Sequence, residues 1–144
     1  MDQASLNGYY LEDLKVGMSA TYARTVTEAD IVLFAGVSGD TNPVHLNHEY
    51  AFTTMFGGRI AHGMLSAGFI STALGTKLPG PGCIYMSQNL KFKAPVKAGD
   101  TVRATVTITE IMTEKKRVAL STICTVSDKT VIEGDAVVMV PSRA

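Results

Sequence analysis

The segment from about Arg59 to Thr76 constrains the fold of this chain more than any other part. It follows a Gly-Gly pair, it ends at a run rich in Pro and Gly (78–82), and its apolar residues cover much of a helical circumference. Gly63 and Gly68 within it permit close approach of other backbone. The pattern predicts one long central helix that is buried on most sides, so the rest of the chain has to cover it.

Five further segments have the character of strands. Apolar and polar residues alternate with a period of two near residues 18–26, 84–93, 102–108 and 118–126, and 132–140 is the predicted last strand. In the second of these, the residues predicted to face inward are Ile84, Met86, Leu90 and Phe92. The charged turn at 114–116 predicts a hairpin between the third and fourth segments.

Two shorter helical segments precede the long one. Thr27 stands three residues before Asp30, which resembles a capping box, and apolar residues then follow at helical spacing until Gly39. A second short helical turn is predicted at about His48 to Thr54. The first of these helices is predicted to end at Gly39, directly before Asp40.

One apolar helix among five one-faced strands predicts an α+β fold, in which an antiparallel β-sheet wraps around the helix. The length of 144 residues is typical of a single domain, here residues 1–144. So few strands cannot close into a barrel, so an exposed sheet edge is expected to pair with a second copy. We therefore expect a homodimer.

Composition excludes several classes of partner. Thirteen Lys and Arg balance thirteen Asp and Glu, so no net charge attracts nucleic acid or an anionic membrane. The N-terminal residues Met1–Ser5 lack the features of a signal peptide, and no apolar stretch is long enough to span a bilayer. The sequence predicts a cytoplasmic protein whose cysteines, Cys83 and Cys124, are reduced core residues.

The densest polar cluster is Gly39-Asp40-Thr41-Asn42-Pro43-Val44-His45, a turn-rich loop after a helix. A carboxylate and an imidazole so close together can hold and polarise one water molecule. Adding water to a double bond conjugated with a thioester needs a base for the water, a proton for C2 and a stabilised enolate oxygen. Asp40 and His45 can supply the first two requirements.

The third requirement points to the start of the long helix, where backbone N–H groups are unpaired and the helix dipole is favourable. Gly63 is the preferred donor there, because the missing side chain lets a substrate carbonyl reach its N–H.

The chain resembles the MaoC-like, or hydratase 2, family of (R)-specific enoyl-CoA hydratases, which have a hot-dog fold. The likeness extends from about Gly17 to Val140 and rests on two motifs, Phe34 to His45 and Gly58 to Met64. It implies reversible hydration of trans-2-enoyl-CoA to (R)-3-hydroxyacyl-CoA at a site near a dimer interface, as in the single-domain enzymes of polyhydroxyalkanoate metabolism. It implies no cofactor, since coenzyme A enters as part of the substrate.

By the same resemblance, each site residue receives a role. The catalytic residues are Asp40, His45 and Gly63, Asn42 supports the loop, and Ser71 and Leu74 shape the acyl pocket.

Other interpretations stay open at this stage. His45 and His48 are three residues apart and Glu49 follows His48, which suggests a metal site. The spacing does not specify which residue would be the third ligand, and the hydration needs no Lewis acid, so no metal is predicted. Rival functions are acyl-CoA thioesterase, 3-hydroxyacyl-carrier-protein dehydratase and a non-catalytic acyl-CoA binding module. The sequence does not determine acyl chain length, the thioester carrier, the contacts to the phosphates of coenzyme A, the physiological direction, or which of Asp40 and His45 acts as base.

Overall fold

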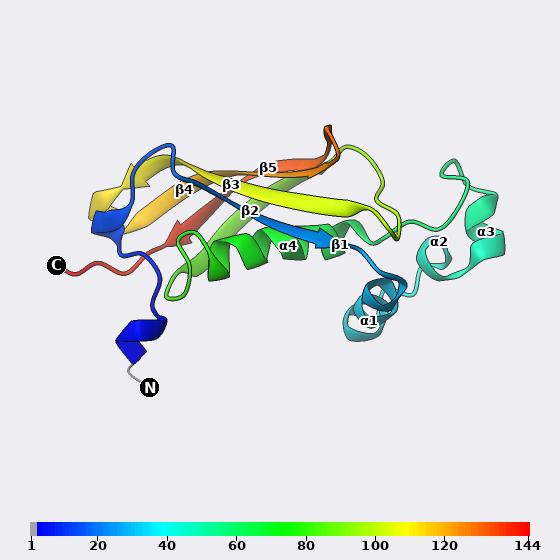
Figure 1. Ribbon diagram of the computed structural model, residues 1–144, viewed down its shortest axis with the longest axis horizontal. Helices are drawn as coiled ribbons and strands as arrows, with labels where there is room; N and C mark the ends of the chain where they lie inside the picture. Colours follow the sequence, from blue (N-terminus) through cyan, green and yellow to red (C-terminus); the bar gives the residue numbers. More distant parts are fainter. Residues whose placement is uncertain (1–2) are drawn as a thin grey trace.

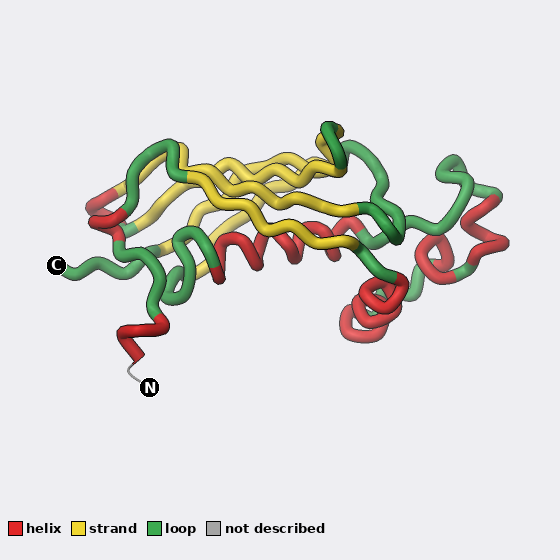
Figure 2. Tube along the Cα trace, viewed as in Figure 1, coloured by secondary structure: helices red, strands yellow, loops and turns green. Residues whose placement is uncertain are grey.

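A computed structural model describes residues 3–144 of the chain; Met1 and Asp2, which belong to the segment predicted to lack the features of a signal peptide, lie outside the described residues. Its strands form one antiparallel sheet in the order β1-β3-β4-β5-β2 (Figures 1 and 2). Their bounds are β1 Ser19–Thr25, β2 Ile84–Phe92, β3 Thr101–Met112, β4 Arg117–Val126 and β5 Lys129–Met139. The five strands and the β3–β4 hairpin are as predicted.

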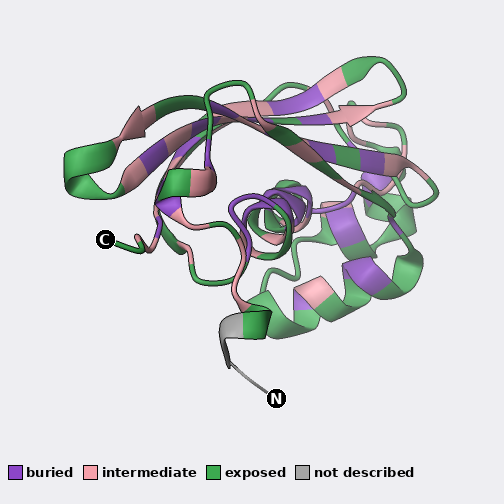
Figure 3. Ribbon diagram, turned by 60° about the vertical axis from the view of Figure 1, so that its left-hand side comes forward, coloured by how far each residue is buried: buried purple, intermediate pink, exposed green. Residues whose placement is uncertain are grey.

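The sheet curves around the long helix α4 (Gly63–Thr76), which Figure 3 shows nearly end-on. One face of α4 is buried and the opposite face, with Met64, Gly68 and Ser71, is exposed, so the helix is less buried than predicted from sequence. Phe69, Ile70 and Leu74 of α4 pack against buried residues of β3, β4 and β5. This arrangement confirms the predicted α+β architecture of a helix wrapped by an antiparallel sheet. Within residues 3–144, no helix combines the length and the apolar character needed to cross a membrane.

The long helix begins four residues later than predicted from sequence, at Gly63 instead of Arg59. The backbone before it is extended because its N–H groups bond outside the helix. Ile60 N donates to Val44 O at 3.2 Å, and Ala61 N donates to Val96 O at 2.7 Å. The first N–H groups of α4 therefore lie beside the loop that carries Asp40.

Three helices lie beyond one end of the sheet, at the end where α4 begins (Figure 1). They are α1 (Glu28–Ser38), α2 (Pro43–Leu46) and α3 (His48–Phe52), and short 3₁₀ turns span Gln3–Leu6, Leu11–Asp13 and Thr113–Lys115. Sequence patterns predicted α1 and α3 but missed α2. Its signal was Asn42-Pro43, an N-cap followed by proline at the first helical position.

The start of α1 confirms the predicted capping box. The Thr27 side chain accepts a hydrogen bond from Asp30 N at 3.1 Å, and Asp30 accepts one from Thr27 N at 3.0 Å. Arg24 of β1 also donates to the buried Asp30 carboxylate. These bonds, that from Arg24 above all, hold the pKa of Asp30 below its usual value.

We expect Asp30→Asn to lower the free energy of unfolding by about 1–2 kcal/mol at neutral pH, because the capping box and the Arg24 ion pair are both weakened. Since the pKa of Asp30 is lowered on folding, the wild-type advantage should be complete above the ordinary aspartate value of about 3.9 and disappear as pH falls through the lowered value. Urea unfolding of both proteins across this pH range measures the difference in their free energies of unfolding. An advantage that is independent of pH would contradict the argument.

The prediction for β2 was wrong in one respect. Its apolar residues were expected to alternate inward, yet Ile84 and Met86 are 55% and 42% exposed. An irregularity between Tyr85 and Ser87 shifts the pairing with β5, so the alternation changes face along the strand. β2 is also a sheet edge with no neighbour on one side. Its exposed apolar side chains follow from both facts.

Candidate active site

The loop after α1 is held by consecutive side-chain-to-backbone hydrogen bonds between residues two apart in sequence. Gly39 ends α1 in a left-handed conformation (φ 78°), which suits glycine. Ser38 Oγ accepts from Asp40 N at 3.1 Å, Asp40 Oδ1 accepts from Asn42 N at 3.2 Å, and Asn42 Oδ1 accepts from Val44 N at 3.1 Å. The exposed Asp40 carboxylate is thus oriented by the loop. Asn42 supports the loop by capping α2.

His45 is buried and its tautomer follows from its partner. Its Nδ1 lies 2.7 Å from Ile60 O. Because a carbonyl only accepts hydrogen bonds, Nδ1 must carry a proton, which leaves Nε2 as the nitrogen that can exchange one. The extended segment before α4 therefore fixes the ring of His45 and selects the nitrogen available for chemistry.

His62, the residue before α4, stacks on His45 with ring centroids 3.8 Å apart and planes inclined by 26°. Its Nε2 lies 2.9 Å from Asp40 O, so Nε2 carries a proton and the neutral ring has its lone pair on Nδ1. His62 is 2% exposed. It joins the loop of Asp40 to the start of α4 through this hydrogen bond.

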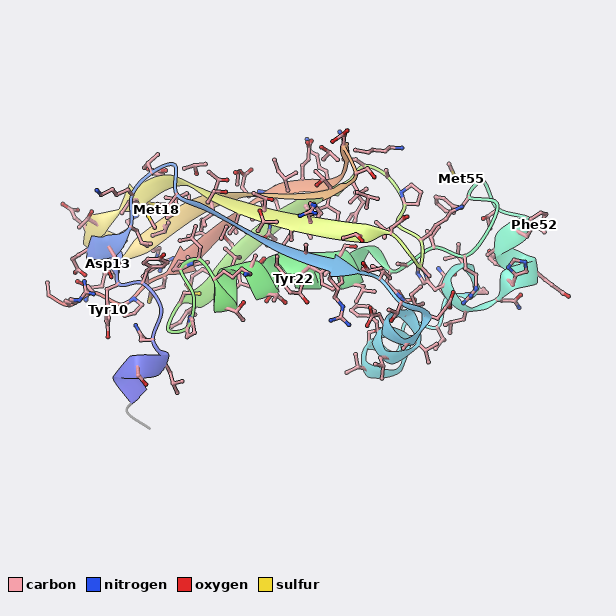
Figure 4. The ribbon with its side chains drawn as sticks, viewed as in Figure 1. Tyr10, Asp13, Met18, Tyr22, Phe52 and Met55 are labelled. Atoms are coloured by element: carbon pink, nitrogen blue, oxygen red, sulfur yellow. The ribbon has the colours of Figure 1, made fainter. Side chains whose placement is uncertain are left out.

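Asp40, His45 and His62 each place one potential ligand atom within 4.8 Å of the others. A metal shared by both imidazoles needs ring-plane lone pairs that converge on one point, whereas lone pairs of nearly parallel stacked rings run side by side. The arrangement suits a small polar molecule such as water better than a metal ion. His48, the third histidine of the chain, is exposed on α3 and contacts Phe52 of the same helix, which is labelled in Figure 4.

A cavity of about 510 Å³ opens beside these residues. Its lining includes Asp40, His62 and Gly63 at one side and a mainly apolar wall from β2, β5 and the segment 94–96. The ring of Phe92 lies against Gly63, where an added Cβ would come within 2.7 Å of two ring carbons. Gly63 therefore leaves both its N–H and the cavity open. Asp40 and Gly63 line this end of the cavity, and His45, which is not part of the lining, places a ring nitrogen within 4.8 Å of an Asp40 carboxylate oxygen.

Arg59 connects two of the helices next to the site. Its Nη2 lies 2.8 Å from Glu28 Oε1 on α1, and its Nη1 lies 3.5 Å from His45 O. The sequence placed Arg59 only at the expected start of the long helix. Because the two partners are 31 and 14 residues away, no local pattern could reveal this link between α1 and α2.

The two residues assigned to the acyl pocket lie in different surroundings. Ser71 is exposed in a groove between α4 and β2, together with Tyr85 and Gln88, whose side chains hydrogen-bond to each other. Burial raises the pKa of Tyr85 to about 12, so its hydroxyl is protonated at neutral pH. Leu74 is 1% exposed and packs in the core between α4 and the sheet. The structure does not bring these two side chains to one surface.

The fold and the site together define a hot-dog domain in which a carboxylate and an imidazole meet beside the start of the central helix. Residues 13–134 match the MaoC like domain, and the chain belongs to this family.

Relatives and solved structures agree. An (R)-specific enoyl-CoA hydratase of Rhodospirillum rubrum is 64% identical over 135 residues, which cover 94% of each chain. The R-hydratase PhaJ1 of Pseudomonas aeruginosa superposes with a TM-score of 0.88 at 46% identity, covering 93% of this chain and 86% of that one. An (R)-hydratase of Aeromonas caviae involved in PHA biosynthesis superposes with a TM-score of 0.87 at 40% identity, covering 90% and 99%.

Proposed function

We propose that this protein catalyses the reversible hydration of trans-2-enoyl-CoA to (R)-3-hydroxyacyl-CoA. The observation that carries the proposal is the meeting of Asp40 and His45, with ligand atoms within 4.8 Å, beside a largely apolar cavity that opens at Gly63. The names of the relatives support the reaction and its stereochemistry. As elsewhere in this reaction class, coenzyme A is part of the substrate, and no separate cofactor or metal is needed.

In the proposed mechanism Asp40 and His45 hold the attacking water. Asp40 takes a proton from the water while the water oxygen bonds to C3. Protonated His45 then gives its Nε2 proton to C2. The proton on Nδ1 stays there throughout and is donated in a hydrogen bond to Ile60 O, so the ring keeps its orientation while Nε2 gains and loses a proton. Proton exchange with solvent then returns the pair to its starting state.

The Gly63 N–H stabilises the negative charge that develops on the thioester oxygen. Gly63 is the first residue of α4, so its N–H has no partner within the helix and lies at the positive end of the helix dipole. Donors aimed at a developing oxyanion in a site shielded from water are among the largest contributions to catalysis.

Crotonyl-CoA tests the proposal directly. Hydration removes the ultraviolet absorbance of the conjugated enoyl thioester, and an added (S)-specific 3-hydroxyacyl-CoA dehydrogenase should then reduce no NAD. Chiral chromatography should identify (R)-3-hydroxybutyryl-CoA. Release of free thiol instead would indicate a thioesterase and would overturn the proposal.

Gly63→Ala should lower kcat/KM for crotonyl-CoA by about a hundredfold, because the new methyl group and the displaced Phe92 ring obstruct the carbonyl site. A double variant, Gly63→Ala with Phe92→Leu, removes the ring that the methyl group would meet. If the double variant stays slow while its urea unfolding matches that of the wild type, access to the N–H is the cause. Full recovery would show that Gly63 matters only for packing against Phe92.

We also propose that the protein is a homodimer. β2 leaves the sheet edge unpaired, and exposed apolar residues continue from it onto the adjoining groove, among them Ile84, Met86, Phe92 and Met64. Sedimentation equilibrium should give twice the chain mass of 15.3 kDa. Localisation in the cytoplasm stays a prediction from sequence.

A further inference from the structure

Two residues that line this cavity each have a buried polar atom without a hydrogen-bond partner. These atoms are Nδ1 of His62 and Oγ of Ser66, on residues that are 2% and 1% exposed and that both line the cavity beside Asp40. A buried polar atom without a partner is costly, and most such atoms in folded proteins are satisfied. The cavity therefore offers two binding groups that the hydration mechanism does not use.

The two groups complement each other. His62 Nε2 is committed as a donor to Asp40 O, so Nδ1 of the neutral ring can only accept. The hydroxyl of Ser66 can donate or accept. His62 immediately precedes α4 and Ser66 lies in its first turn, and both residues line the same cavity. Together they suit an oxygen that accepts from Ser66 and donates to His62, which is the bonding pattern of an O–H group.

We propose that His62 and Ser66 form a polar subsite that binds a hydroxyl group on C4 of the acyl chain, so that the enzyme accepts 4-hydroxy-2-enoyl thioesters. This inference rests on the proposed function, which places the thioester carbonyl at Gly63. Ser66 lies three residues further, about 4.5 Å along the helix axis. In an extended acyl chain C4 is about 4 Å from C1, so the distances correspond.

The remaining lining favours a neutral group over a carboxylate. The cavity wall near Ser66 includes the apolar side chains of Phe92 and Ile132. The only cationic side chain in the described lining is Lys93, which is half-exposed and lies 3.5 Å from Glu133. A carboxylate at C4 would lose its hydration without a buried positive charge to offset the loss, whereas a methyl group would leave both polar atoms unpaired.

Binding of two saturated thioesters, which cannot be hydrated, tests the subsite separately from catalysis. Calorimetry should give a Kd for 4-hydroxybutyryl-CoA about tenfold below that for butyryl-CoA in the wild type, the effect of one buried hydrogen-bonded group. In Ser66→Ala this ratio should fall to about one. Thr72→Ala is the matched control, because it removes another hydroxyl of α4 that already donates to Gly68 O. The control should keep the wild-type ratio.

The same comparison in turnover uses crotonyl-CoA and 4-hydroxycrotonyl-CoA. Ser66→Ala should lower kcat/KM for the hydroxylated substrate about tenfold more than for crotonyl-CoA. If the wild type shows no preference in binding, or if Ser66→Ala keeps it, the two atoms hold only a water molecule and the proposal is overturned. If neither enoyl thioester is hydrated, the proposed function fails, and the ratio of the two Kd values still decides the subsite.

Discussion

Replacing Asp40 with Asn should lower kcat/KM for crotonyl-CoA about a thousandfold while leaving the fold intact. The amide oxygen can still accept the hydrogen bond from Asn42 N, which is 3.2 Å long in the wild type, so the loop should keep its shape. An amide cannot take the proton that the attacking water must lose, and losing a general base typically costs a factor of about 10² to 10⁴. Steady-state kinetics together with urea unfolding separate the two effects.

Asp100→Asn provides the matched control. Its carboxylate also accepts a backbone N–H three residues away, from Lys97 at 2.9 Å, but Asp100 is not in the cavity lining. This variant should turn over crotonyl-CoA at the wild-type rate. A folded Asp40→Asn protein that does the same would remove Asp40 from the reaction and leave it a turn-forming residue.

The architecture followed from patterns that depend on near neighbours in sequence. The apolar circumference of α4 and the alternation in β3 and β4 report burial directly, because each side chain faces the core or the solvent according to the local period. The capping box of α1 was visible for the same reason, since Thr27 and Asp30 bond to each other. Elements of this kind carry their own signal.

The errors arose where distant contacts decide the local structure. The helix was expected at Arg59, but Ile60 and Ala61 bond to Val44 and Val96 and stay extended. In β2 one irregularity in the pairing with β5 changed the face on which later residues lie. In each of these interactions the two partners are far apart in sequence, so periodicity alone could not predict them.

The candidate site divides in the same way. Asp40, Asn42 and His45 fall within six residues of one another, and the loop itself suggested their chemistry. Arg59 and Ser66 became recognisable only from the structure. Arg59 binds partners on two other helices, and Ser66 resembles any serine of an apolar helix until its burial without a hydrogen bond is seen. Residues whose surroundings are set by distant contacts are therefore harder to predict than those gathered in one loop.

His45→Asn should reduce kcat/KM for crotonyl-CoA about a hundredfold or more, because the asparagine amide can replace only one of the two ring nitrogens. The N–H group of the asparagine can occupy the place of Nδ1 and donate to Ile60 O. This keeps the buried hydrogen bond, which is 2.7 Å long in the wild type. Nothing replaces Nε2, so C2 loses its proton donor. His48→Asn, an exposed change three residues away, should leave the rate unchanged.

The two changes at Asp40 and His45 together decide how the protons move. If His45→Asn unfolds in urea at the wild-type midpoint or near it, its loss of rate belongs to the missing Nε2 and not to the lost stacking on His62. If the folded variant keeps its rate within a factor of about ten while Asp40→Asn does not, the division proposed above is wrong. Asp40 would then both remove the proton from water and return it to C2, and His45 would serve to position the loop through Ile60.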